Sequence, residues 1–125
     1  MSENSKSSVC SPASKLIFSC SGAADVGEIA DKTARKLTKK SVGKMFCLAG
    51  VAGKVGAIVD ATKSASKILA IDGCGVDCAK KCLENAGFEN FQHIRITDMG
   101  MEKGKTAVSE ENIANAAEKA GSLLS

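Results

Sequence analysis

The chain has 125 residues, 44% of them hydrophobic, a net charge of +3, no Trp or Tyr and four Phe. This length suits one domain whose core is built from aliphatic side chains. The small, dispersed charge and the shortage of aromatic side chains argue against nucleic-acid binding. No segment reaches the roughly 18 apolar residues of a membrane span, and the start of the chain does not resemble a signal peptide. We therefore expect a soluble, cytoplasmic protein with no membrane partner.

The first segment of the chain differs in composition from the rest. Residues 1–14 are rich in serine, contain the only proline, Pro12, and show no hydrophobic periodicity. Such a segment cannot bury enough apolar surface to fold. The sequence therefore predicts a disordered tail over 1–14, which carries Cys10, followed by a single α/β domain over 15–125.

Four strand-and-helix units are predicted after the tail. Short apolar runs, typical of buried strands, alternate with longer segments whose apolar residues recur every three or four positions, as in helices. A polar loop is expected at 99–108. The predicted strands are 15–22, 43–50, 67–73 and 91–98, and the predicted helices are 24–40, 51–67, 75–87 and 109–124.

Each of the four predicted helices has a recognisable boundary or buried face. Gly87 suits the left-handed position that ends a helix, and Ser109 suits the N-cap of the last one. We expect the buried faces to be Val26, Ile29, Ala30, Thr33 and Leu37 in the first helix, Val55, Ile58, Val59 and Thr62 in the second, and Ile113, Ala116, Ala117 and Ala120 in the last.

The alternation of strands and helices predicts a Rossmann-like fold. A four-stranded parallel sheet with helices on both faces follows from right-handed crossovers, and we expect the strand order 2-1-3-4. Ligands of such sheets bind at the carboxyl ends of the strands, where successive connections leave to opposite sides. That point lies between strands 1 and 3, which end near Cys20 and Cys74.

Cysteines are the residues most suggestive of chemistry in this sequence. Six cysteines in a reducing compartment favour metal binding or thiol chemistry over disulfides. In the predicted topology Cys20, Cys47, Cys74 and Cys78 reach one corner of the sheet. Cys74 lies at the junction of strand and helix and Cys78 one helical turn beyond it, and residues four apart at helical spacing have Cβ atoms about 5–6 Å apart. Four thiolates suit either zinc or an iron–sulfur cluster, and the spacing does not separate the two.

Two further cysteines are interpreted differently. Cys82 shares the apolar stripe of its helix with Ala79, Leu83 and Ala86, so we expect it to pack in the core. Cys10 lies in the predicted tail, which would allow it either to reach the site as an extra ligand or to take no part in it.

The segments "FSCSGAADVGEIADKTARKL", "CLAGVAG" and "IDGCGVDCAKKCLENAG" resemble the DGC-domain family, named for its Asp-Gly-Cys motif. The resemblance runs from about residue 15 to the last helix. Members are regarded as zinc-binding proteins because of four cysteines, which implies zinc ligation here by Cys20, Cys47, Cys74 and Cys78. Gly75 departs from the proline that we associate with this family, and proline would hold the turn more firmly.

Several other motifs resemble catalytic or ligand-binding motifs but have simpler structural interpretations. "GMEKGKT" is one residue short of a P-loop, so we expect a solvated loop. Val26 stands where a C-x5-R phosphatase would need arginine. The glycines of "GVAGKVG" indicate tight packing of a strand against a helix rather than an anion site. His93, in the fourth strand, is expected to be structural and apart from the cysteine loops. Asp72 and Asp77 either orient the site by hydrogen bonds or cap a helix and face solvent.

These observations leave three hypotheses for function. Zinc held by four thiolates would be closed to substrate and would have a structural or sensory role. A thiol redox or sulfur-transfer enzyme would use Cys20 as its nucleophile and Cys74 or Cys78 to resolve the intermediate. An iron–sulfur protein is the third.

Overall fold

The computed structural model of the protein describes residues 14–125. Apart from Ser14, the predicted tail, with Cys10 and Pro12, lies outside this range. Four strands form one parallel sheet in the order β2-β1-β3-β4, which confirms the predicted topology. The strands are β1 (Lys15–Ser19), β2 (Lys44–Met45), β3 (Lys67–Asp72) and β4 (Gln92–Arg95). The helices are α2 (Asp25–Lys39), α3 (Leu48–Ala52), α4 (Gly56–Lys63), α5 (Cys78–Asn85), the short 3-10 helix η1 (Ile96–Met99) and α6 (Glu110–Ser122).

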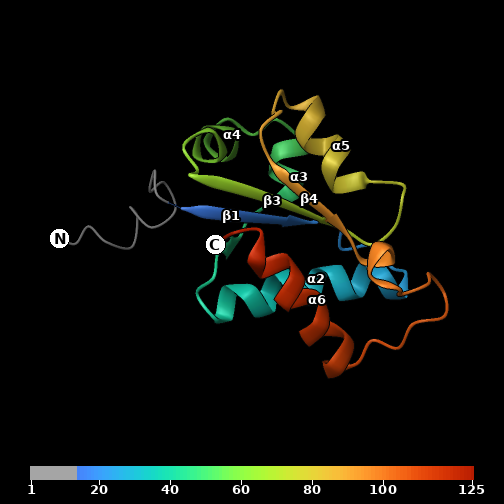
Figure 1. Ribbon diagram of the computed structural model, residues 1–125. Coiled ribbons are helices and arrows are strands. Elements are labelled where there is room, and N and C mark those ends of the chain that lie inside the picture. Colours follow the sequence, from blue (N-terminus) through green and yellow to red (C-terminus); the bar gives the residue numbers. More distant parts are fainter. Residues whose placement is uncertain (1–13) are drawn as a thin grey trace.

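Helices cover both faces of the sheet, as predicted: α3, α4 and α5 lie above it in Figure 1, and α2 and α6 lie below. Successive side chains of a strand point to opposite faces, so a strand covered on both sides reads as a continuous apolar run. In β1, Leu16 and Phe18 pack with α3 and α5, whereas Ile17 packs with α2 and α6. All three side chains are completely buried.

The long helices α2 and α6 bury the faces predicted for them. The stripe of α2 from Val26 to Leu37 and the stripe of α6 from Ile113 to Ala120 both lie in the core. Ser109 is the N-cap of α6, where its Oγ accepts a hydrogen bond from Asn112 N at 3.1 Å. The predicted cap and the acidic first turn therefore start this helix together.

The second unit differs from its predicted form. β2 has only two residues, α3 begins within the segment expected to be strand, and the helix expected over 51–67 is reduced to α4. Lys54, between α3 and α4, has a left-handed backbone with a φ of +57°. The two helices pack so closely that a Cβ on Gly50 would lie 2.8 Å from the Ile58 side chain. This close contact is between two helices, whereas the packing predicted for these glycines was between a strand and a helix. Val55 is exposed rather than on the buried face.

The third and fourth units also differ at their boundaries. α5 begins at Cys78 instead of 75, because Asp77 has a left-handed backbone with a φ of +60°. Gly87, with a φ of +96°, has the left-handed conformation predicted beyond the end of this helix. β4 stops at Arg95, and the residues expected to continue it turn into η1.

The two-residue strand β2 lies at one edge of the sheet. Phe46 N donates to Ile17 O at 2.8 Å, which joins this segment to β1. The preceding amide, Met45 N, does not bond with β1 but donates at 2.8 Å to Oγ1 of Thr38 in α2. A side chain from the first helix therefore bonds with the outward backbone of the edge strand.

Candidate functional site at the carboxyl edge of the sheet

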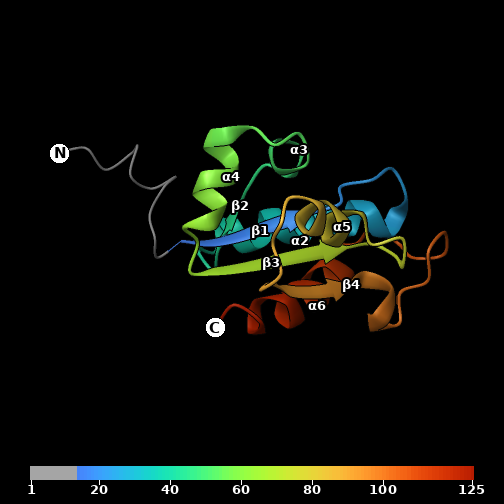
Figure 2. The ribbon, with the colours of Figure 1, turned by 90° about the horizontal axis from the view of Figure 1, so that it is seen from above.

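Loops from distant parts of the sequence meet where the parallel strands end. The strand arrows point to the side of the molecule where the segments after β1 and β3 and the segment before α6 lie together (Figures 1 and 2). Cys20 directly follows β1, and Cys47 and Cys74 follow β2 and β3 with one residue between the strand and the cysteine. The five described cysteines are free thiols.

The half-buried thiol of Cys20 contacts the Asp-Gly-Cys segment directly. Its Sγ accepts a hydrogen bond from Gly73 N at 3.2 Å, and its own amide donates to Ile71 O at 3.1 Å. Gly73 in turn lies against the first turn of α2, where an added Cβ would come within 2.8 Å of Gly27 N. The segments that follow β1 and β3 are thus in direct contact next to Cys74.

Cys47 is exposed and starts the short helix α3. Its Sγ accepts a hydrogen bond from Gly50 N at 3.3 Å, so the sulfur occupies the place that a serine or aspartate oxygen usually takes at an N-cap. The prediction placed Cys47 late in a strand. The residue instead belongs to a helix start, which turns its side chain toward solvent.

A lysine from the loop 100–108 reaches Cys74. Lys103 Nζ donates to Cys74 Sγ at 3.6 Å. The loop is attached to Asp25 of α2, whose carboxylate accepts hydrogen bonds from Gly104 N at 2.9 Å and Thr106 N at 3.0 Å. These amides hold the pKa of Asp25 below its usual value. The loop is exposed, as predicted, but its amides bind a carboxylate of the same chain.

Cys82 lies closer to the candidate site than predicted. It is half-buried, is absent from both core clusters, and lines a cavity of about 340 Å3 together with Cys20. The pKa of the Cys82 thiol is raised, chiefly by burial and to a smaller extent by the nearby Cys78 and Asp72. The expectation that Cys82 packs in the core was therefore wrong. Since α5 begins at Cys78, Cys78 and Cys82 are the pair one helical turn apart, and Cys74 precedes the helix.

Asp72 is a buried carboxylate at the end of β3, only 1% exposed. Its oxygens accept hydrogen bonds from Ala79 N at 2.7 Å and Lys80 N at 3.1 Å, and His93 Nε2 lies 2.8 Å from Oδ2. A carboxylate that receives amides at a helix N-terminus interacts favourably with the helix dipole. Asp72 therefore caps α5 from within the core, and it does not face solvent.

Asp77, the second aspartate beside the cysteines, is 7% exposed and pairs with Arg95 of β4. Arg95 Nε donates to Asp77 Oδ1 at 2.7 Å, and Arg95 Nη2 donates to Oδ2 at 2.6 Å. This bidentate ion pair lowers the pKa of Asp77 and raises the pKa of Arg95. His93 Nε2 is 3.6 Å from Asp77 Oδ1. His93 is thus connected to the cysteine loop, contrary to the prediction.

Asp72, Asp77 and His93 are the group of metal-ligand side chains, among residues 14–125, whose ligand atoms lie within 4.8 Å of one another. Their oxygens are already engaged by Arg95 and by the amides of α5. No cysteine belongs to this group within the described range. A tetrahedral zinc site, with Zn–S bonds of about 2.3 Å, places its sulfurs roughly 3.8 Å apart. The thiols of the carboxyl edge are thus in a more open arrangement than a closed site requires.

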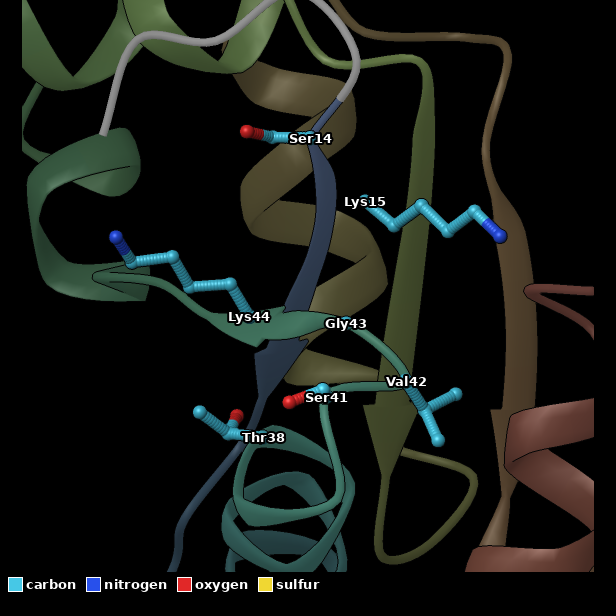
Figure 3. A pocket seen from close by; sticks show the side chains of 7 residues that line it. All are labelled: Ser14, Lys15, Thr38, Ser41, Val42, Gly43 and Lys44. Carbon is cyan, nitrogen blue, oxygen red and sulfur yellow. The ribbon is translucent and has the colours of Figure 1, made fainter. Parts of the chain in front are cut away.

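A larger hollow lies at the opposite edge of the sheet, near the starts of β1 and β2. It has a volume of about 500 Å3 and is lined by Ser14, Lys15, Thr38, Ser41, Val42, Gly43 and Lys44. Figure 3 shows that the side chains of Lys15 and Lys44 extend in opposite directions. The described residues of its lining include no thiol, carboxylate or imidazole. Among residues 14–125, the chemistry present at the carboxyl edge is therefore not repeated in this hollow.

Two residues of the edge, Arg95 and Lys103, were not identified from the sequence. Arg95 had a readable signal: it follows His93 by two positions on a strand, so both side chains share a face. The strand pairing sets Arg95 beside Asp72. Lys103 had no comparable signal, because its position depends on the attachment of a long loop to Asp25.

Fold and site together define the class of protein: an open, doubly wound α/β domain with free thiols at the carboxyl edge of its sheet. None of the helices that the structure describes is long and apolar enough to cross a bilayer. The family model of the DGC domain matches residues 16–120. The chain therefore belongs to the DGC-domain family, as its motifs suggested.

A curated relative agrees with this assignment. The chain is 34% identical over 88 residues to the "Anaerobic and virulence modulator AnvM" of Pseudomonas aeruginosa strain PAO1. The match covers 70% of this chain and 67% of the relative. No solved structure shows a significant match to the chain.

Proposed function

We propose that the protein binds one zinc ion through Cys20, Cys47, Cys74 and Cys78, in a structural or sensory role. The observation that supports this most directly is the convergence of cysteines: β1, β2 and β3 lie side by side, and each is followed by a cysteine at the same edge. Thiolates are the preferred ligands of structural zinc.

The hydrogen bonds of the edge are of a kind that supports sulfur ligands of a metal. Cys20 and Cys47 each accept a backbone N–H at their sulfur, and Cys74 accepts a bond from Lys103. Donors of this kind orient metal ligands and compensate their negative charge. Four thiolates and one zinc ion carry a net charge of −2, so the Lys103 ammonium would favour the loaded state.

Metal binding would draw the thiols together. Cys47 and Cys78 are exposed and stand at the first turns of α3 and α5, where small movements of a helix start can bring a sulfur inward. Zinc bound by four thiolates has no open position for water, which supports a structural or sensory role over a hydrolytic one. The name of the relative, a modulator, agrees with a sensory role.

Metal analysis tests this proposal. We expect protein purified without added metal to contain about one zinc per chain, and single Cys→Ser changes at the four proposed ligands to lose it. Cys82→Ser is the matched control, because Cys82 lies nearby but outside the proposed set, and it should retain zinc. Visible absorption with acid-labile sulfide would instead identify an iron–sulfur cluster.

The carboxylate and imidazole group is the competing location for a metal. Zinc that is retained in all four serine variants but lost in Asp72→Asn and His93→Gln would overturn the thiolate proposal. Retention in His93→Gln is expected, because the Asp72 oxygens already receive hydrogen bonds from α5.

A thiol enzyme with Cys20 as the nucleophile is a second candidate. One observation favours it: Cys20 borders an apolar cavity of about 340 Å3, which would admit a small substrate, and Cys82 borders the same cavity. Metal-free protein would then be alkylated by iodoacetamide faster at Cys20 than at the exposed Cys47. Faster reaction at Cys47 would show that accessibility alone governs reactivity and would reject this candidate.

A further inference from the structure

We propose that Asp77 and Arg95 are positioning residues, which set the direction of the first turn of α5 and so place Cys78 relative to Cys74. This inference rests on the proposed metal site. Neither side chain would bind the metal; both act on the backbone between two of its ligands. Three features of the structure carry the inference.

The first feature is the backbone of Asp77. Its φ of 60° and ψ of 44° place it in the left-handed region, which residues with a Cβ rarely adopt. Its amide donates to Cys74 O at 3.2 Å and closes a turn, and the helix begins at the next residue. The conformation of this one residue therefore decides where Cys78 lies relative to Cys74.

The second feature is the anchor of that conformation. Arg95 holds both carboxylate oxygens of Asp77 at 2.7 and 2.6 Å; the Asp77 side chain is 9% exposed and that of Arg95 is 34% exposed. Two parallel charge-assisted bonds fix orientation as well as distance. Arg95 is also part of the sheet, since β4 pairs with β3 and places Arg95 beside Asp72. The ion pair thus attaches the turn to the sheet, which is the rigid part of the fold.

The third feature is the other end of the same segment. Asp72 is buried and bonded to the first turn of α5, and the next residue, Gly73, is packed against α2 without room for a side chain. Between these ends the segment is open: Val76 is 55% exposed and Gly75 has no neighbour within 4 Å of a Cβ position. Asp72 and Asp77 therefore confine a segment that would otherwise move.

Cobalt titration of the metal-free protein tests the inference, because Co2+ reports thiolate number and geometry in its visible spectrum. We expect Arg95→Gln to weaken binding ~10- to 100-fold, the range found when residues behind metal ligands are changed. We also expect weaker thiolate charge-transfer absorption, since Cys78 would leave the coordination sphere. A purely structural role for Arg95 would not alter the spectrum of the bound ion.

Arg35→Gln is the matched control. Arg35 also pairs with an aspartate, Asp31, at 2.7 Å, but its side chain is 64% exposed and lies on the surface of α2. The same substitution there should leave affinity and spectrum unchanged. Equal cobalt affinity and equal spectra for Arg95→Gln and the wild-type protein would overturn the inference while leaving the proposed metal site intact.

Two changes at Asp77 keep the test decisive if Arg95→Gln does not fold. Asp77→Gly removes the ion pair but accepts a left-handed backbone without strain, whereas Asp77→Ala removes the pair and keeps the strain. We expect Asp77→Ala to bind cobalt several-fold more weakly than Asp77→Gly. Equal affinities would overturn the inference. A wild-type protein that binds no cobalt would instead reject the proposed function on which the inference rests.

Discussion

The close approach of Gly73 to α2 allows a quantitative prediction. An alanine Cβ at this position would lie 2.8 Å from Gly27 N and Val26 C and 3.0 Å from Val26 O. All three are backbone atoms in the first turn of a helix, so no side-chain rotation can relieve the contact. Overpacking of this kind costs typically 1–3 kcal/mol, and we expect Gly73→Ala to fall in the upper part of that range.

Urea denaturation, followed by far-UV circular dichroism, measures this loss. A destabilisation of about 2–3 kcal/mol with a denaturant slope of about 1.5 kcal/mol/M lowers the midpoint by roughly 1.3–2 M. Gly75→Ala is the control, because it makes the same change two residues away, where an added Cβ would have no described atom within 4 Å apart from those of its chain neighbours. We expect that midpoint to be unchanged or slightly raised. Midpoints for the two variants within about 0.3 M of each other would refute the proposed close approach.

Three other predictions concern polar groups. Thr33 Oγ1 is buried with no hydrogen-bond partner among the described residues, so Thr33→Val should leave the free energy of unfolding unchanged or raise it. Thr62→Val deletes a hydrogen bond to a helix carbonyl and should lower the free energy of unfolding by about 1 kcal/mol. A larger loss of stability for Thr33→Val than for Thr62→Val in urea denaturation would contradict this. Asp25→Ala should release the loop 100–108 and speed its amide hydrogen exchange, and unchanged exchange would show that the loop holds itself. The pKa of Asp77 is lowered from 3.8 by its arginine partner, so its contribution to stability is present above that value and is lost as pH falls below it; Asp77→Asn should therefore flatten the decline of thermal stability below about pH 4, and an unchanged slope would argue against the pair.

Much of the fold could be predicted because its cues are local. The alternating sides of β1 and the spaced apolar residues of α2 report burial directly, and Ser109 starts a helix by bonding three residues ahead. Parallel strands joined by helices leave few topologies, since the crossovers are right-handed. The strand order, and with it the edge that carries Cys20 and Cys74, followed from the same cues.

The prediction failed where a distant side chain decides local conformation. Spacing alone set Cys78 one helical turn beyond Cys74, but Asp77, just before the helix, has a left-handed backbone that Arg95, 18 residues later, holds in place. Cys47 was misplaced for a different reason. An apolar run such as Met45–Leu48 is compatible with a strand or with a helix start, and periodicity does not separate them.

The hydrogen bond from Met45 N to Thr38 Oγ1 has a consequence for association between molecules. An edge strand with unpaired amides is a template for another strand, and exposed edges promote aggregation. Here the edge strand has two residues, and its outward amide is already bonded to α2. Another chain could extend the sheet at β2 only by displacing Thr38 from this amide. The first helix therefore protects this side of the sheet from β-strand addition.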